Sequence, residues 1–365
     1  MHIPLDVRSE WADVCVFFKA LRFSIQKIEI HQRRRAMPDE REGERMPFFE
    51  CRGLCRAVGV PLIAGAVIAS SCRVASVHAT EGGGTNYPVG VNTLLPGIQP
   101  APGNHIYVYL QDYEATTLEG NGGDPSTSVS NFSLHAQAAA FRLSHVWRDV
   151  TLFGATLESR TNIPFVNLDL HFDAATPKGP LYKSGRASGL SDMTLGPLFL
   201  GWHIGNLHQV LGLEFFVPTG GYEASRLVNP GRNYYSMQPN YAVTWLPTPN
   251  IELSARALYS VNSVNHATDY HSGNEFIVDY SAGYRFTPMW QIGASGYFYK
   301  QVTDDVQHGL TVNGNGNRGQ AFAVGPSIAY GNRKFSVALK YQREMLVRNR
   351  PEGNRIWLQM YMPFQ

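Results

Sequence analysis

The residues of this chain best suited to metal binding are histidines and cysteines; most of the histidines are scattered singly, and two local groupings stand out. His266 and His271 flank Asp269 in one polar segment, a spacing that could hold a metal ion. Histidines in such segments are more often simply solvated. Cys51 and Cys55 form a close pair, but no second Cys/His pair follows at a suitable distance. The sequence therefore predicts no metal site and no cofactor.

Catalytic signatures are missing from the sequence. There is no Gly-x-Ser-x-Gly elbow, no His-Glu-x-x-His and no phosphate-binding loop. We therefore predict no catalytic residues and a protein that is not an enzyme. A hydrolase whose serine and histidine are distant in sequence remains an alternative, since such pairs meet only in the fold. The net charge of +2 offers no reason to expect nucleic acid as a partner.

Aromatic residues recur at alternate positions of extended segments and suit contact with a solute. An inward-facing aromatic set is predicted, consisting of Tyr107, Tyr109, Tyr113, Phe216, Tyr297 and Tyr299. Tyrosine combines an apolar ring with a polar tip, which favours stacking of aromatic solutes. The alternative is that these rings only fill space.

Charged residues occupy the same inward positions. The predicted set is Glu252, Arg256, Asp279, Arg285 and Lys340. An ion-selectivity filter would favour one sign of charge, whereas this set carries both. We interpret it as a ladder of salt bridges that fills and stiffens the lumen.

The elements that carry these residues are predicted strands. Segments of about ten residues alternate apolar and polar side chains, as in 251–257, 276–286 and 335–342, and this is the length that a tilted strand needs to cross a membrane. Hydrophobic residues make up 44% of the chain, charged residues only 16%, and mean hydropathy is -0.20, which suits a membrane barrel or a soluble β-sandwich.

The connections decide between these two folds. Short turns such as 248–250 and 287–288 alternate with long polar loops, which we place at 120–130, 174–189, 222–233, 262–273 and 303–318. This sorting is typical of outer-membrane barrels. The segment 161–173 could be an extra strand or a loop folded inward. We predict an all-β protein, a transmembrane antiparallel up-and-down β-barrel of about 12 strands.

The final segment supports this fold. Ile356, Leu358, Met360, Met362 and Phe364 form one apolar face, and Trp357, Gln359 and Tyr361 form the other. A terminal strand ending on an aromatic residue resembles the signal read by the outer-membrane assembly machinery, which is therefore an expected partner. Gln365 follows Phe364 and departs from that signal by one residue.

The amino-terminal part is predicted to be a targeting region. Residues 46–79 have the basic, apolar and small-residue sections of a signal peptide, with cleavage near Ala79. A lipoprotein site at Cys72 is the alternative. Residues 1–45 are interpreted as a gene-model extension before Met46 or a disordered leader, residues 80–103 as a Gly/Pro-rich opening segment, and residues 104–365 as the barrel. The expected location is the bacterial outer membrane, with lipid and lipopolysaccharide as partners.

A series of short blocks resembles one known family in order and spacing, nearly throughout the mature chain. The blocks are Glu81-Gly-Gly-Gly-Thr-Asn-Tyr-Pro, Leu190-Ser-Asp192 with Gly196-Pro197, Pro218-Thr-Gly220 with Tyr222, Asn229-Pro-Gly231-x-Asn233, Asp269-Tyr-His-Ser-Gly-Asn-Glu275, Gly296-Tyr-Phe-Tyr-Lys-Gln-Val-Thr-Asp-Asp305, Gly325-Pro326 and Asn349-Arg350. The chain thus resembles the outer-membrane family named for the MetA pathway of phenol degradation.

The resemblance implies a barrel that takes up small hydrophobic or aromatic compounds, linked to phenol degradation. It carries over no catalytic residues. By analogy with fatty-acid channels, residues 80–103 could fold into the lumen as a plug. A structural or adhesive barrel, with loops that bind an outside partner, is the alternative function.

Overall fold

A computed structural model describes residues 84–332 and 334–364. The predicted boundaries of residues 1–45 and 46–79, and the cleavage near Ala79, lie outside the described residues. Strands dominate the described part, and its helical content is a single short 3-10 turn, Val312–Gly314. No helix in the described ranges is long and apolar enough to cross a membrane.

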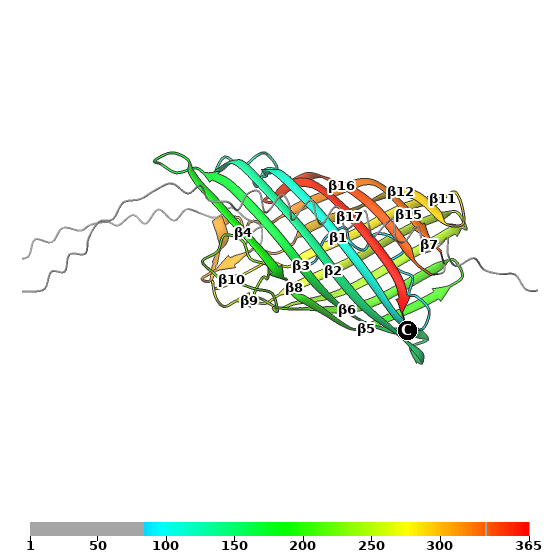
Figure 1. Ribbon diagram of the computed structural model, residues 1–365. Coiled ribbons are helices and arrows are strands. Elements are labelled where there is room, and N and C mark those ends of the chain that lie inside the picture. Colours follow the sequence, from blue (N-terminus) through cyan, green and yellow to red (C-terminus); the bar gives the residue numbers. More distant parts are fainter. Residues whose placement is uncertain (1–83, 333, 365) are drawn as a thin grey trace, which may run out of the picture. The chain divides into compact units, whose positions relative to one another are not determined.

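Thirteen strands form one large antiparallel sheet (Figure 1). They are β1 (Gly103–Leu118), β2 (Val129–Leu152), β3 (Ala155–Ala174), β4 (Leu181–Leu190), β5 (Met193–Ile204), β6 (Leu207–Val217), β7 (Ser236–Thr248), β8 (Ile251–Asn262), β11 (Glu275–Arg285), β12 (Trp290–Gln301), β15 (Gln320–Gly331), β16 (Ser336–Arg348) and β17 (Pro351–Phe364).

The sheet closes on itself because β1 pairs with both the last strand and the second. Tyr107 of β1 lies opposite Tyr361 of β17 on one side and opposite Arg142 of β2 on the other. β2 then pairs with β3, and the remaining strands follow in chain order around the ring. β4 pairs with β3 and continues the line of β5, so the ring has twelve positions. The prediction of an antiparallel barrel of about 12 strands is confirmed.

The structure decides one open expectation for the region after β2 and corrects another. Segment 161–173, left open between a strand and an inward loop, is part of β3, a strand of 20 residues. The long polar loop expected at 174–189 is wrong, because Leu181–Leu190 forms β4 and pairs with the second half of β3. The sequence gives no alternating pattern for β4, because the exposed side chains of this strand include both polar and apolar residues. The actual loop is 175–180.

The connections sort as predicted between the two ends of the barrel, except for the two-residue turn 349–350 between β16 and β17, which lies at the long-loop end. Short turns join β2 to β3, β5 to β6, β7 to β8, β11 to β12 and β15 to β16, while longer loops join β6 to β7, β8 to β11 and β12 to β15. Two of these loops carry a small four-stranded sheet of β9 (Val264–Asn265), β10 (Tyr270–His271), β13 (Val306–Gln307) and β14 (Leu310–Thr311). In bacterial barrels the long loops face the outside.

The outer wall of the barrel is apolar, and this is what lipid requires. Large hydrophobic side chains are exposed on every strand of the large sheet except β1, for example Leu211, Ile292 and Leu339. Ile356 and Phe364 of β17 face outward, whereas Trp357 is only 2% exposed, so the predicted faces of the last strand are confirmed. The barrel fold and this lipid-compatible surface place the chain in the bacterial outer membrane.

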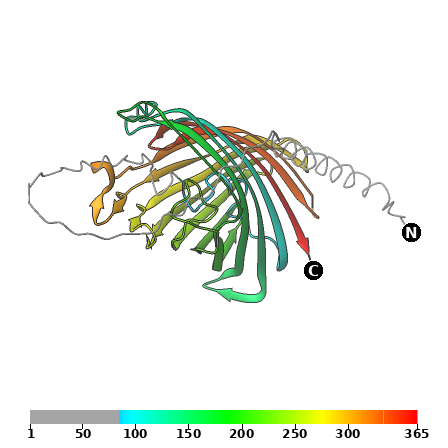
Figure 2. The same cartoon turned by 60° about the vertical axis from the view of Figure 1, so that its left-hand side comes forward.

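The segment before β1 runs inside the ring. Its hydrogen-bond partners lie on β2, β3, β5, β7, β8, β11, β16 and β17, so they surround it on all sides. Thr85 and Asn86 contact the loop ends of β11 and β7, while Gln99 contacts Thr156 near the opposite end. Figure 2 shows this part of the chain within the curved wall. We call residues 84–102 the inner segment.

Candidate solute-binding site inside the barrel

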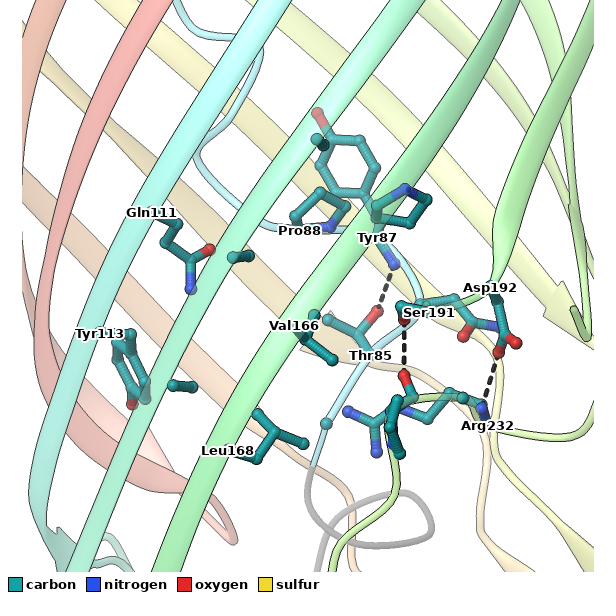
Figure 3. Close-up of a pocket in the computed structure, with 18 of the residues that line it drawn as sticks. Thr85, Tyr87, Pro88, Gln111, Tyr113, Val166, Leu168, Ser191, Asp192 and Arg232 are labelled. Carbon is teal, nitrogen blue, oxygen red and sulfur yellow. Dashed lines mark hydrogen bonds between the residues drawn. The ribbon is translucent and has the colours of Figure 1, made fainter. Parts of the chain in front are cut away.

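The described part of the chain contains a cavity of about 380 Å³ within the barrel. Three parts of the chain enclose it: the wall of β1, β2 and β3, the inner segment, and the loop between β6 and β7 (Figure 3). This volume lies in the range of small-molecule sites, which are typically a few hundred cubic ångströms. A molecule of the size of a substituted benzene ring would fit.

One side of the cavity is apolar. Ala136, Ala138 and Ala140 of β2 line it, together with Val166 and Leu168 of β3. The alternate residues of β2 face lipid, as Phe141 does. Small alanines on the inner face leave room for the cavity, because a larger inward side chain would occupy it. This side of the cavity, formed by β2 and β3, can therefore accept an apolar ring.

The inner segment forms the opposite side and is held firmly. The Tyr87 hydroxyl donates to Asp279 Oδ2 at 2.7 Å, and the backbone N–H groups of Gly90 and Asn92 donate to the same carboxylate. Lys340 Nζ donates to the backbone oxygens of Gly90 and Val91. The rings and methyl groups of this segment pack in the main buried cluster of the barrel.

The third side is the loop between β6 and β7, which Asp192 organises. Asp192 Oδ1 accepts the N–H of Gly220 at 2.9 Å, and Oδ2 accepts the N–H of Arg232 at 2.7 Å. Ser191 donates to the backbone oxygen of Pro230 at 2.6 Å. Figure 3 shows Asp192 and Ser191 facing Arg232 beneath the inner segment. The break between β4 and β5 thus serves to anchor this loop.

Arginines stacked on tyrosines complete the cavity. Arg355 lies over the rings of Tyr113 and Tyr297, with its guanidinium carbon 4.6 and 5.2 Å from their centroids. Arg142 lies 4.9 Å from the Tyr109 centroid. Such cation–π stacking fixes the plane of each guanidinium and leaves its edge for hydrogen bonds.

The six predicted aromatic residues all point inward, but they divide between two places. Tyr109, Tyr113 and Phe216 line the cavity. Tyr297 and Tyr299 are fully buried in the main cluster, with Tyr107 packed against it. The role of all six in solute binding stays a prediction.

The predicted charge set is also inside the barrel, with partners that the ladder interpretation did not foresee. Arg256 pairs with Glu214, whereas Asp279 and Lys340 bind the inner segment. Glu252 is also buried inside the barrel and accepts a hydrogen bond from Gln291 at 2.7 Å. Arg285 is only half-buried near the short-turn end.

Sequence reasoning missed the residues that give the cavity its polarity. Arg142, Arg350, Arg355 and Asp192 were not among the predicted site residues. Arg355 could have been found, because it shares the inward parity of Trp357 on the last strand. Arg142 follows three alternating alanines, which carry little periodic signal.

The histidines considered for a metal site do not converge in the structure. Asp269 contacts His308, and His271 Nε2 lies 2.9 Å from the backbone oxygen of Asn262. Within the described residues, the group whose ligand atoms lie close together is instead Asp112, Glu114 and His135, on the outer faces of β1 and β2.

Comparison with known proteins identifies the family. The sequence model described as "Putative MetA-pathway of phenol degradation" matches residues 119–360. The chain belongs to this family. The match begins directly after β1 and ends within β17, four residues before that strand ends, so the resemblance noted in the sequence is confirmed. No curated protein sequence matches the chain.

One solved structure supports the fold of this MetA-pathway family member, and two others are less similar to the chain. The COG4313 outer membrane channel from Pseudomonas putida F1 is 18% identical, with a TM-score of 0.60, and the match covers 73% of this chain and 97% of that one. The Ralstonia pickettii toluene transporter TbuX is 10% identical with a TM-score of 0.39, covering 73% and 90%. The CymD monoaromatic hydrocarbon channel is 9% identical with a TM-score of 0.38, covering 74% and 92%. Only the first is similar enough to support an argument, and it supports the fold.

Proposed function

We propose that this protein is a channel for the uptake of small hydrophobic or aromatic compounds across the outer membrane, linked to phenol degradation. The observation that carries the proposal is the cavity itself, with Ala138 and Val166 on one side and Tyr109 and Tyr113 on another. An apolar wall facing aromatic rings and a few polar groups is the usual composition of a small-molecule site. Membership of the MetA-pathway family agrees with this substrate class.

In this proposal the inner segment acts as a plug. It spans the lumen from the loop end to the short-turn end, and Asp279 and Lys340 bind its backbone. A solute in the cavity lies against Thr85, Tyr87 and Val89 of this segment. Passage to the periplasmic side then requires the segment to shift, since its residues fill the barrel below the cavity.

Uptake into liposomes tests the proposal. Ala138→Phe adds a ring to the inner face of β2 and should fill the cavity, so uptake of phenol and toluene should fall strongly. Ala139→Phe is the matched control, because the neighbouring residue points to the lipid side and the same ring there should leave uptake unchanged.

Heat-modifiable migration in electrophoresis confirms that both variants form barrels. Equal uptake by the two variants, or no uptake by the folded wild-type protein, would contradict the channel. The second outcome would favour a structural or adhesive barrel.

A further inference from the structure

The cavity is asymmetric in charge. Five arginines and two carboxylates line it: Arg142, Arg226, Arg232, Arg350 and Arg355 against Asp192 and Glu214. Both carboxylates are already engaged. Asp192 accepts two backbone N–H groups, and Glu214 pairs with Arg256. Arg226 pairs with Glu223 at 2.8 Å, outside the cavity lining, whereas Arg142 has Glu214 only as a more distant counter-charge that Arg256 already holds.

Arg142 is the arginine least matched by charge. It is 7% exposed, and its Nε and Nη2 donate to Asn162 Oδ1 and Asn92 Oδ1 at 2.9 and 3.0 Å. Both acceptors are neutral amides, and no carboxylate of the described chain lies within ion-pair distance of it. A buried guanidinium is normally paired with an anion because of the cost of removing its charge from water.

Two further buried arginines lie toward the loop end, and each keeps a guanidinium nitrogen without a hydrogen-bond partner among the described residues. Arg350 stacks on Tyr299 at 4.1 Å, and its Nη1 has no hydrogen-bond partner among the described residues. Arg355 donates Nη1 to the backbone oxygen of Val89 and forms an ion pair with Glu344 at 3.7 Å, and its Nε has no hydrogen-bond partner in the part of the chain that the structure describes. The three guanidinium groups therefore follow one another down the cavity, from the β16–β17 turn to the middle of β2.

We propose that the cavity binds aromatic carboxylates in preference to uncharged aromatic compounds of the same size, with Arg142 as the carboxylate partner. This inference rests on the proposed function, since it names the substrate class of the same site. The ring of the ligand lies against Ala138 and Val166, and its carboxylate faces the arginines. Arginine binds a carboxylate through two parallel hydrogen bonds, which a neutral amide or a phenol cannot replace.

Binding of benzoate and of its neutral isostere benzamide to the purified protein in detergent tests the inference by calorimetry. Benzoate should bind roughly tenfold or more tightly than benzamide at neutral pH, because a hydrogen bond to a charged group is worth more than one between neutral groups. Arg142→Gln should weaken benzoate binding roughly ten- to hundredfold and leave benzamide nearly unchanged. Arg343→Gln, which removes the same charge from the outer face of β16, should affect neither ligand.

A second variant guards against misfolding of the first. Asn162→Asp places a carboxylate beside Arg142 Nε without removing the arginine, so it should weaken benzoate binding while the barrel retains its heat-modifiable migration. Equal affinity for benzoate and benzamide, or equal effects of Arg142→Gln and Arg343→Gln, would overturn the carboxylate preference and leave the channel intact. Failure of both ligands to bind the folded wild-type protein would overturn the preference and the proposed function together.

Discussion

Asp279 and Lys340 hold the same few residues of the inner segment from two strands of the barrel. Asp279 on β11 accepts the N–H groups of Gly90 and Asn92, at 2.8 and 3.0 Å. Lys340 on β16 donates to the backbone oxygens of Gly90 and Val91, at 2.9 and 2.7 Å. Opposite charges thus satisfy the donors and acceptors of one buried turn of chain, which has no strand partner of its own.

Loss of this clamp should loosen the inner segment. Lys340→Met leaves the Val91 oxygen without its donor and the Gly90 oxygen with only the 3.3 Å bond from Gln342. Asp279→Asn replaces a charged acceptor by a neutral one. We expect both variants to raise single-channel conductance in planar bilayers severalfold. Lys183→Met, at an exposed position on β4, is the control for the lost charge. Conductance equal to wild type in both clamp variants would show that the inner segment does not limit passage.

The loop between β6 and β7 should depend on Asp192 for its order. Its carboxylate accepts the N–H groups of Gly220 and Arg232, which lie on the two segments of this loop. The two segments approach so closely that a Cβ on Gly220 would lie 2.6 Å from Gly231 Cα. Asp192→Ala removes both acceptors, and each N–H left unpaired costs about 1–3 kcal/mol. We expect faster tryptic cleavage after Arg226 and Arg232, detected by mass spectrometry. Asp169→Ala, which removes a partly exposed carboxylate on β3 that pairs with Arg186 and not with this loop, should leave the rate of cleavage after Arg226 and Arg232 unchanged.

The buried pair of Glu214 and Arg256 should behave differently when one or both partners are replaced. Each side chain is at most 3% exposed. Glu214→Gln leaves the guanidinium without its counter-charge and should lower the free energy of unfolding by about 3–5 kcal/mol. The double variant Glu214→Leu with Arg256→Met should recover most of that loss, because both charges are removed together. Denaturant titration in detergent measures both, and a double variant less stable than the single one would contradict this account.

The strands were predictable wherever one face meets lipid and the other meets the lumen. In β8 and β11, apolar residues such as Leu253 and Phe276 alternate with buried polar ones such as Ser254 and Asp279, so a period of two marks each strand. β4 escaped this reasoning because Tyr182 and Lys183 are both exposed. Where neither face is uniformly apolar, alternation leaves no signal.

The cavity was only half predictable for a related reason. The inward direction of Tyr109 and Tyr113 could be predicted, because alternate residues of β1 point into the barrel. Tyr87 and its hydrogen bond to Asp279 do not follow, because the inner segment has no periodicity and its partner is 192 residues away. A contact between irregular backbone and a distant strand depends on how the ring closes, which local patterns do not encode.

Stability should fall as pH rises on account of Glu119, which lies in the loop after β1. Burial, reinforced by the neighbouring carboxylates of Glu352 and Asp124, raises the pKa of Glu119 above its usual value. The folded protein therefore holds this proton at pH values where the unfolded chain has lost it. The favourable contribution is complete below the unfolded pKa of about 4.3 and is lost as pH rises through the folded pKa. Glu119→Gln should remove this pH dependence. At pH values above the folded pKa of Glu119, it should also raise the midpoint temperature of unfolding. Glu114→Gln, on the outer face of β1, serves as the control. Parallel pH profiles of the wild type and Glu119→Gln, measured by heat-modifiable migration from pH 4 to pH 8, would show that Glu119 is not the group responsible.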